Sequence, residues 1–156
     1  MKALKYISRV SDDQARFGAK LGLDLRGCTV SVAEARIEDV VDVEFHGAPS
    51  VGNPTPKQIA LAAKFGYDIA GLSRREGDAV IDDLMIELNH EAIEAEGLAP
   101  GVTVVNVHDN IGRTFVISSV YSDGTVYFRG GNGQRAWARS LRRISITSEQ
   151  QTAFPR

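Results

Sequence analysis

Three histidines and one cysteine are the residues of this 156-residue chain best suited to metal binding or nucleophilic chemistry. His108 precedes Asp109 directly, a pair that forms a general-base dyad in other settings, whereas His46 and His90 stand alone. No Cys/His pair has the spacing of zinc ligands, and Cys28 has no second cysteine to join. We therefore interpret the histidines as surface or turn residues, with metal ligation as the alternative, and expect no metal and no cofactor.

A glycine-rich segment from Arg129 to Arg135, RGGNGQR, is the second place to look for chemistry. Its amides and bordering arginines suit one phosphate, but it lacks the GxxxxGK[ST] spacing of a phosphate loop. Alternating residues flank the segment, which favours a wide hairpin turn over a nucleotide loop. The chain also lacks a recognisable nucleophile with its base, paired catalytic carboxylates and a dinucleotide fingerprint. We therefore expect no enzymatic activity, with a small hydrolase or nuclease as the alternative.

Aromatic and arginine side chains alternate with apolar ones between Thr125 and Arg139. Period-two alternation sends one set toward a core: Val126, Phe128, Ala136 and Ala138. The opposite side then carries Tyr127, Arg129, Arg135, Trp137 and Arg139. Charge interleaved with stacking platforms suits nucleic acid, so we predict that this side binds DNA or RNA. The alternative is that Trp137 caps the edge of a barrel beneath arginine stems.

Two arginine pairs extend this prediction. We add Arg142 and Arg143 to the nucleic-acid contacts. Arg74 and Arg75 stand in the first turn of an expected helix, where the helix dipole disfavours cations, so we take them as a secondary basic contact. Plain solvated surface is the alternative for both pairs.

Charge divides the chain into two halves. Residues 1–97 carry 11 Lys/Arg against 17 Asp/Glu, a net charge of −6, whereas residues 98–156 carry 7 Arg against 3 acids, a net charge of +4. Opposite charge favours two modules with different partners, and the acidic half suits a basic protein.

The first half contains a sequence that occurs twice. Residues 11–41 match residues 55–84 with a period near 44, which is typical of a repeated supersecondary unit. Each copy opens with a capping box, and its first helix is predicted to end at a glycine, Gly22 or Gly66.

A second helix is predicted in each copy. We place its cap at Ser31 and at Ser73, where S-x-x-E recurs, which requires a loop two residues longer in the first copy. The later helix is predicted to continue to a stop at Gly97. Neither copy buries its apolar face alone, so we predict that the two helical hairpins pack together.

From Pro100 onward the hydrophobic period changes to two residues. We predict five short strands at Val102–Val107, Arg113–Tyr121, Thr125–Arg129, Arg135–Arg139 and Ile144–Ile146. A one-turn helix is expected at residues 140–142. Strands this short and this close in sequence are typical of a small antiparallel barrel.

Both halves resemble known families. The segments LGLD (Leu21–Asp24) with Gly27 and FGYD (Phe65–Asp68) with Gly71 resemble the helix-extension-helix modules of SAP and LEM proteins, which implies contact with DNA or DNA-associated proteins. The repeats lack the dense lysines of SAP modules, so we assign nucleic-acid contact to the second half. Val102 to Ile146 resembles an SH3-like barrel of the KOW/Tudor type, which implies nucleic-acid or peptide binding.

We therefore predict an α+β protein with tandem helical-hairpin repeats and a C-terminal five-stranded SH3-like antiparallel barrel. The expected domains are repeat 1 (1–45), a linker (46–54), repeat 2 (55–97), the barrel (98–147) and a tail (148–156). The predicted function is a non-enzymatic nucleic-acid-binding accessory protein whose acidic repeats contact a protein partner. The alternative is an adaptor or inhibitor that binds no nucleic acid. The start lacks a signal-peptide pattern and no segment could span a bilayer, so we expect a cytoplasmic protein with no membrane partner.

Overall fold

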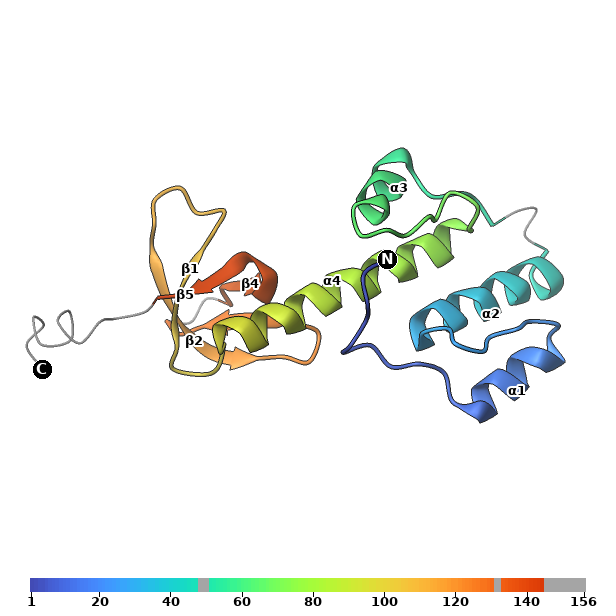
Figure 1. The fold of residues 1–156 in the computed structure, drawn as a ribbon, viewed down its shortest axis with the longest axis horizontal. Coiled ribbons are helices and arrows are strands. Elements are labelled where there is room, and N and C mark those ends of the chain that lie inside the picture. Colours follow the sequence, from blue (N-terminus) through green and yellow to red (C-terminus); the bar gives the residue numbers. More distant parts are fainter. Residues whose placement is uncertain (48–50, 131–132, 145–156) are drawn as a thin grey trace, which may run out of the picture. The chain divides into compact units, whose positions relative to one another are not determined.

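Figure 1 shows the fold in a computed structural model, which describes residues 1–47, 51–130 and 133–144. Four helices come first: α1 (Asp12–Lys20), α2 (Val30–Phe45), α3 (Pro56–Ala63) and α4 (Arg74–Glu96). Five strands and a 3-10 helix follow: β1 (Thr103–Asn106), β2 (Thr114–Val120), β3 (Thr125–Phe128), β4 (Arg135–Trp137), η1 (Ala138–Ser140) and β5 (Leu141–Arg143). The predicted α+β class is confirmed. None of the helices in the described ranges is both long and apolar enough to cross a membrane.

The chain divides into two compact units, Met1–Glu87 and Leu88–Arg156, and the division falls inside α4. The first unit contains the two matching stretches, residues 11–41 and 55–84, and the second contains the sheet. Of the predicted linker and tail, residues 48–50 and 148–156 lie outside the part of the chain that the structure describes.

The two repeats have matching local structure at a constant spacing of 44 residues, from Ser11 to Thr55. Capping boxes start α1 and α3 at these two residues, as predicted. A glycine with positive φ follows each helix, at +79° for Gly22 and +82° for Gly66. In both copies the residue after this glycine donates its amide to a carbonyl of the preceding helix: Leu23 to Gly18, and Tyr67 to Ala62. The turns therefore have the same backbone path.

The second helix of the first repeat begins earlier than predicted. Its cap is Thr29, whose hydroxyl accepts from the Val32 amide, and Ser31 lies inside the helix. Ser73 caps α4 and accepts from the Glu76 amide at 3.0 Å. Thr29 and Ser73 stand 44 residues apart, so the predicted longer loop is wrong. The S-x-x-E pattern placed the cap at Ser31, but Thr29 can cap the helix without a glutamate three residues later, so that pattern does not mark the start of α2.

The repeats pack together through α2 and α4, as predicted. Their shared cluster consists of Val32, Ala35 and Ala79, with Cys28 and Val80 packed against it. Ala35 and Ala79 hold corresponding places, six residues after each cap, and their small side chains allow close approach of the helices. Leu25 and Ile69 also correspond and are fully buried, which stabilises each repeat by about 1.5–3 kcal/mol.

The five strands of the second unit form one antiparallel sheet in the order β4-β3-β2-β1-β5. Its fully buried side chains include Val104, Ile117 and Val126. Only the three residues of η1 join edge strand β4 to edge strand β5. Because three residues span only about 10 Å, the end of β4 lies near the start of β5.

The last strand lies earlier than predicted, at Leu141–Arg143 in place of Ile144–Ile146, whose residues 145–146 are outside the described ranges. The single helical turn is Ala138–Ser140, so Arg139 belongs to η1 and β4 ends at Trp137. The reason is burial: Ala138 and Leu141 are both fully buried in the core, which fixes the phase of this segment.

Candidate nucleic-acid interface

The hairpin of β3 and β4 separates its side chains as the alternation predicted. Val126, Phe128 and Ala138 are buried in the core, and Ala136 packs against it. On the other side, Tyr127 pairs with Arg135 across the strands, and Thr125 pairs with Trp137. The Tyr127 hydroxyl accepts from Arg135 Nη1 at 3.2 Å.

Tyr121 joins this side, although sequence alternation did not identify it. Its ring lies beside that of Tyr127, with centroids 4.9 Å apart and planes inclined at 46°. Strict alternation from buried Ile117 would point Tyr121 into the core. A β-bulge between Ile117 and Ser119 shifts the alternation by one residue, so Tyr121 points to the other side of the sheet. The adjacent serines 118 and 119, which interrupt the apolar pattern of β2, were the available signal. We name this surface the aromatic–arginine face: Tyr121, Tyr127, Arg135 and Trp137.

The aromatic–arginine face is open to solvent in the second unit. Tyr121 is 54% exposed and Trp137 is 45% exposed. Arg135 forms no ion pair with any carboxylate among the described residues, and the hydrogen bond to Tyr127 raises its pKa, so it stays charged. Arg129, just beyond β3, is also exposed, and no carboxylate of the described ranges pairs with it. The face therefore combines two exposed rings with one cation, Arg135, and Arg129 adds a second exposed cation just beyond β3.

Arg139, in η1, contacts both Trp137 of the face and the buried side chain of Asn89. Its guanidinium lies 5.1 Å from the centroid of the Trp137 ring. Its amide and Nη1 both donate to Oδ1 of Asn89, at 3.1 and 3.2 Å, and burial lowers its pKa. Asn89 is 1% exposed and donates in turn to the Asp123 carbonyl at 3.1 Å. The contact between Arg139 and Trp137 is the cation–π contact expected if Trp137 caps the edge of a barrel. It holds the indole in place and leaves Trp137 nearly half exposed.

A small cavity of about 220 Å³ lies beside Arg135 in the second unit. It is lined by Asn106, Asp109, Arg113, Phe115, Phe128, Gln134 and Arg135. The rings of Phe115 and Phe128 stack at 4.7 Å and form an aromatic wall. Asp109 accepts from the amides of Ile111 and Arg113 and from Arg113 Nε, bonds that lower its pKa. Its carboxylate is thus engaged away from His108, and the dyad does not form.

The glycine-rich segment joins β3 to β4, as the hairpin interpretation predicted. The Phe128 amide donates to the Gln134 carbonyl at 3.1 Å, and Gly130 and Gly133 take positive φ. Residues 131–132 lie outside the described ranges.

Arg142 and Arg143 lie on β5, an edge strand that the three residues of η1 join to β4. Arg142 Nε lies 3.9 Å from Glu96, and its Nη1 donates to the Arg139 carbonyl at 3.1 Å. The Arg143 amide donates to Glu96 at 3.0 Å, and its side chain is exposed.

Arg74 and Arg75 lie in the first unit and differ from each other. Arg74 is exposed. Arg75 contacts three carboxylates of α2: Glu38 at 3.3 Å, Asp39 at 3.1 Å and Asp42 at 2.7 Å. These carboxylates compensate its unfavourable place in the first turn without an external anion.

His46 and His90 have separate partners. His46 Nδ1 lies 3.1 Å from Asp42, and His90 Nε2 lies 2.8 Å from the Ser122 carbonyl. No group of three His, Cys, Asp or Glu within residues 1–47, 51–130 and 133–144 could hold a metal ion.

Comparison with models of known protein families, with curated proteins and with solved structures found no match to this chain.

Proposed function

We propose that the second unit binds single-stranded nucleic acid on the aromatic–arginine face, as a non-enzymatic accessory protein. The observation that carries this proposal is one side of the sheet on which exposed Tyr121, at the end of β2, and exposed Trp137, on β4, accompany Arg135, which forms no ion pair among the described residues. Folding requires neither exposed rings nor an exposed guanidinium at these places. Single strands, in contrast, bind through stacking on aromatic rings and through backbone charge.

Arginine suits the role better than lysine. A guanidinium forms bidentate contacts to phosphate and stacks on bases, and the basic half of the chain has seven arginines and no lysine. Arg129 extends the positive charge beyond the end of β3. The cavity that Arg135 lines, with the Phe115 and Phe128 rings in its wall, offers room for one planar group.

The proposal includes a small barrel of the SH3-like type as the scaffold. The support for closure is the three-residue η1 between the two edge strands. Curvature of this kind exposes the outer side of the β3–β4 hairpin, where the face lies.

Fluorescence anisotropy with a labelled homopolymer of about 20 nucleotides tests the proposal, because that length exceeds the ~4–16 nucleotides bound by other small stacking domains. Tyr121→Ala should weaken binding about 5- to 150-fold, the equivalent of roughly 1–3 kcal/mol of stacking. Arg135→Ala should weaken it as well and reduce the slope of log affinity against log salt by about 0.7. Single- and double-stranded DNA and RNA are compared in the same assay.

Two matched controls keep the assay specific. Ile111→Ala removes a side chain that is 78% exposed but lies outside the face, and Arg142→Ala removes a cation already near Glu96. Both should bind nearly as the parent does. A parent that binds no oligonucleotide at low salt, or face variants indistinguishable from these controls, would overturn the proposal and leave protein interaction as the function.

A further inference from the structure

The second repeat has a short extended segment seated on its glycine corner. The Lys2 amide donates to the Phe65 carbonyl at 2.8 Å, and the Lys2 carbonyl accepts from the Tyr67 hydroxyl at 2.7 Å. A Cβ on Gly66 would lie 2.8 Å from the Cα of Met1, so the segment passes directly over the glycine. The corner between α3 and its following extension thus binds main chain.

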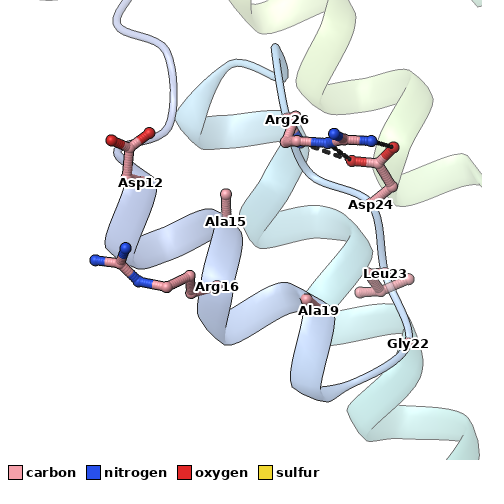
Figure 2. Close-up of a pocket in the computed structure, with 8 residues that line it drawn as sticks. All are labelled: Asp12, Ala15, Arg16, Ala19, Gly22, Leu23, Asp24 and Arg26. Atoms are coloured by element: carbon pink, nitrogen blue, oxygen red, sulfur yellow. Dashed lines mark hydrogen bonds and ion pairs between the residues drawn. The ribbon is translucent and has the colours of Figure 1, made fainter.

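The corresponding corner of the first repeat is open. Gly22 has the same backbone conformation as Gly66, but a Cβ there would meet no atom within 4 Å. A cavity of about 560 Å³ begins at this glycine and runs between α1 and the extension that follows it (Figure 2). Figure 2 shows Ala15 and Ala19 on α1 facing the segment that carries Leu23. These three side chains and Gly22 provide an apolar floor.

The charges around this groove indicate what could lie in it. Arg26 forms a bidentate pair with Asp24, with both distances 2.9 Å (Figure 2), and Arg16 pairs with Asp13 outside the groove. Both cations are therefore compensated within the repeat. Asp12, which also lines the groove, is exposed and has no partner in the described part of the chain.

We propose that this groove binds an extended segment of a partner protein, placed over Gly22 as Met1 and Lys2 are placed over Gly66. The hydrogen bond from the Tyr67 hydroxyl has no counterpart, because Leu23 stands at that place. The segment donates an amide to the Leu21 carbonyl, the counterpart of the Phe65 carbonyl, and places an apolar side chain over Gly22. A lysine or arginine close by reaches Asp12. This inference rests on the part of the proposed function that gives the acidic repeats a basic protein partner, and it is independent of the aromatic–arginine face.

A peptide with the sequence of residues 1–7 of this chain, MKALKYI, is the probe. We expect it to shift the amide resonances of the ¹⁵N-labelled full chain at Ala15, Ala19 and residues 21–24, in a saturable manner with a Kd on the order of 0.1–1 mM. The matching amides of the second repeat, residues 63–68, should not move. Their own tethered segment competes at an effective concentration of about a millimolar or more.

Ala19→Arg places a large side chain in the groove, and its positive charge repels the lysines of the peptide. The position is exposed on α1, and arginine is a good helix former, so the helix should stay stable. This variant should lose the shifts. Lys20→Ala, at the neighbouring residue outside the groove, should keep them, and Asp12→Asn should weaken the peptide several-fold. Absence of saturable shifts in the parent, equal shifts with a scrambled peptide, or unchanged binding by Ala19→Arg would overturn the inference. The same samples are also titrated with the oligonucleotide. Loss of peptide binding with oligonucleotide binding retained would contradict this inference alone and leave the nucleic-acid proposal standing.

Discussion

The hydroxyl of Thr29 donates to Asp83 at 2.6 Å, and 44 residues later the hydroxyl of Ser73 donates to Asp39 at 2.5 Å. Thr29 and Ser73 cap α2 and α4, and each aspartate stands ten residues after the cap of its own helix. The start of each helix is therefore held by a carboxylate of the other. Asp83 is only 4% exposed, and a second hydroxyl, from Ser31 at 2.5 Å, helps to satisfy it. These reciprocal contacts fix the register of the two repeats.

The cap position can be tested by comparing Thr29→Ala with Ser31→Ala. Thr29→Ala removes both the cap of α2 and a buried bond to Asp83, so it should lower the free energy of unfolding by about 1–2 kcal/mol. Ser31→Ala removes one partly exposed bond and no cap, and should cost about half as much. Urea unfolding followed by helical circular dichroism measures both. A larger loss for Ser31→Ala would place the cap where the sequence pattern suggested.

Gly22→Ala and Gly66→Ala form a matched pair. Both place a Cβ at a positive φ, which costs about 1 kcal/mol. Gly66→Ala also forces the Cβ against the backbone of Met1, so it should release the segment and speed hydrogen exchange of the Lys2 amide. Gly22→Ala should leave that amide unchanged. Equal protection of Lys2 in the two variants would show that the segment does not occupy the corner.

The Asp24 carboxylate provides a pH-dependent test. Hydrogen bonds from the Arg26 side chain, followed by the Arg26 amide, lower the pKa of Asp24 to about 2. A folded pKa below the unfolded value stabilises the fold above about pH 4. That contribution is lost as the pH falls from 4 through 2. Arg26→Ala should raise the pKa of Asp24 toward 3.8, measured by NMR titration of the carboxyl carbon; a pKa unmoved by this change would show that the pair does not form in solution.

Asn89 should be essential for the hairpin between β2 and β3. Asn89→Ala leaves the Arg139 amide and the Asp123 carbonyl without their partner, at a cost of about 1–3 kcal/mol. Gly124→Ala should be equally severe, because its φ is +88° and its Cβ would lie 2.2 Å from the Asn89 Cβ. Hydrogen exchange should rise in the sheet, with amides of the first repeat as the internal control. Sheet protection equal to that of the parent would contradict this role.

Local features of the fold could be predicted from the sequence because their causes are local. The capping boxes at Ser11 and Thr55 and the glycine stops at Gly22 and Gly66 each depend on a few adjacent residues. The same holds for the alternation of the β3–β4 hairpin. The constant spacing of the repeats was missed at Thr29, because that cap acts without a capping box and relies on distant Asp83.

Features that depend on other elements could not be predicted in the same way. The bulge that exposes Tyr121 arises in the pairing of β2 with β3, and the start of β5 follows from burial of Leu141. Compensation of Arg75 requires carboxylates of α2 that lie 33 and 36 residues earlier in the sequence. The sequence therefore predicted Tyr127, Arg135 and Trp137 of the candidate site, but not Tyr121, whose place depends on the bulge.

The most direct measurement uses the single tryptophan of the chain, Trp137, as its own reporter. Titration with an unlabelled oligothymidylate at low salt should quench its emission in a saturable manner, because a stacked base contacts the exposed part of the indole. Added salt should reverse the quenching, and Arg135→Ala should shift the titration to higher concentrations, whereas Arg142→Ala should not. Emission that stays constant throughout the low-salt titration would contradict nucleic-acid binding by the aromatic–arginine face.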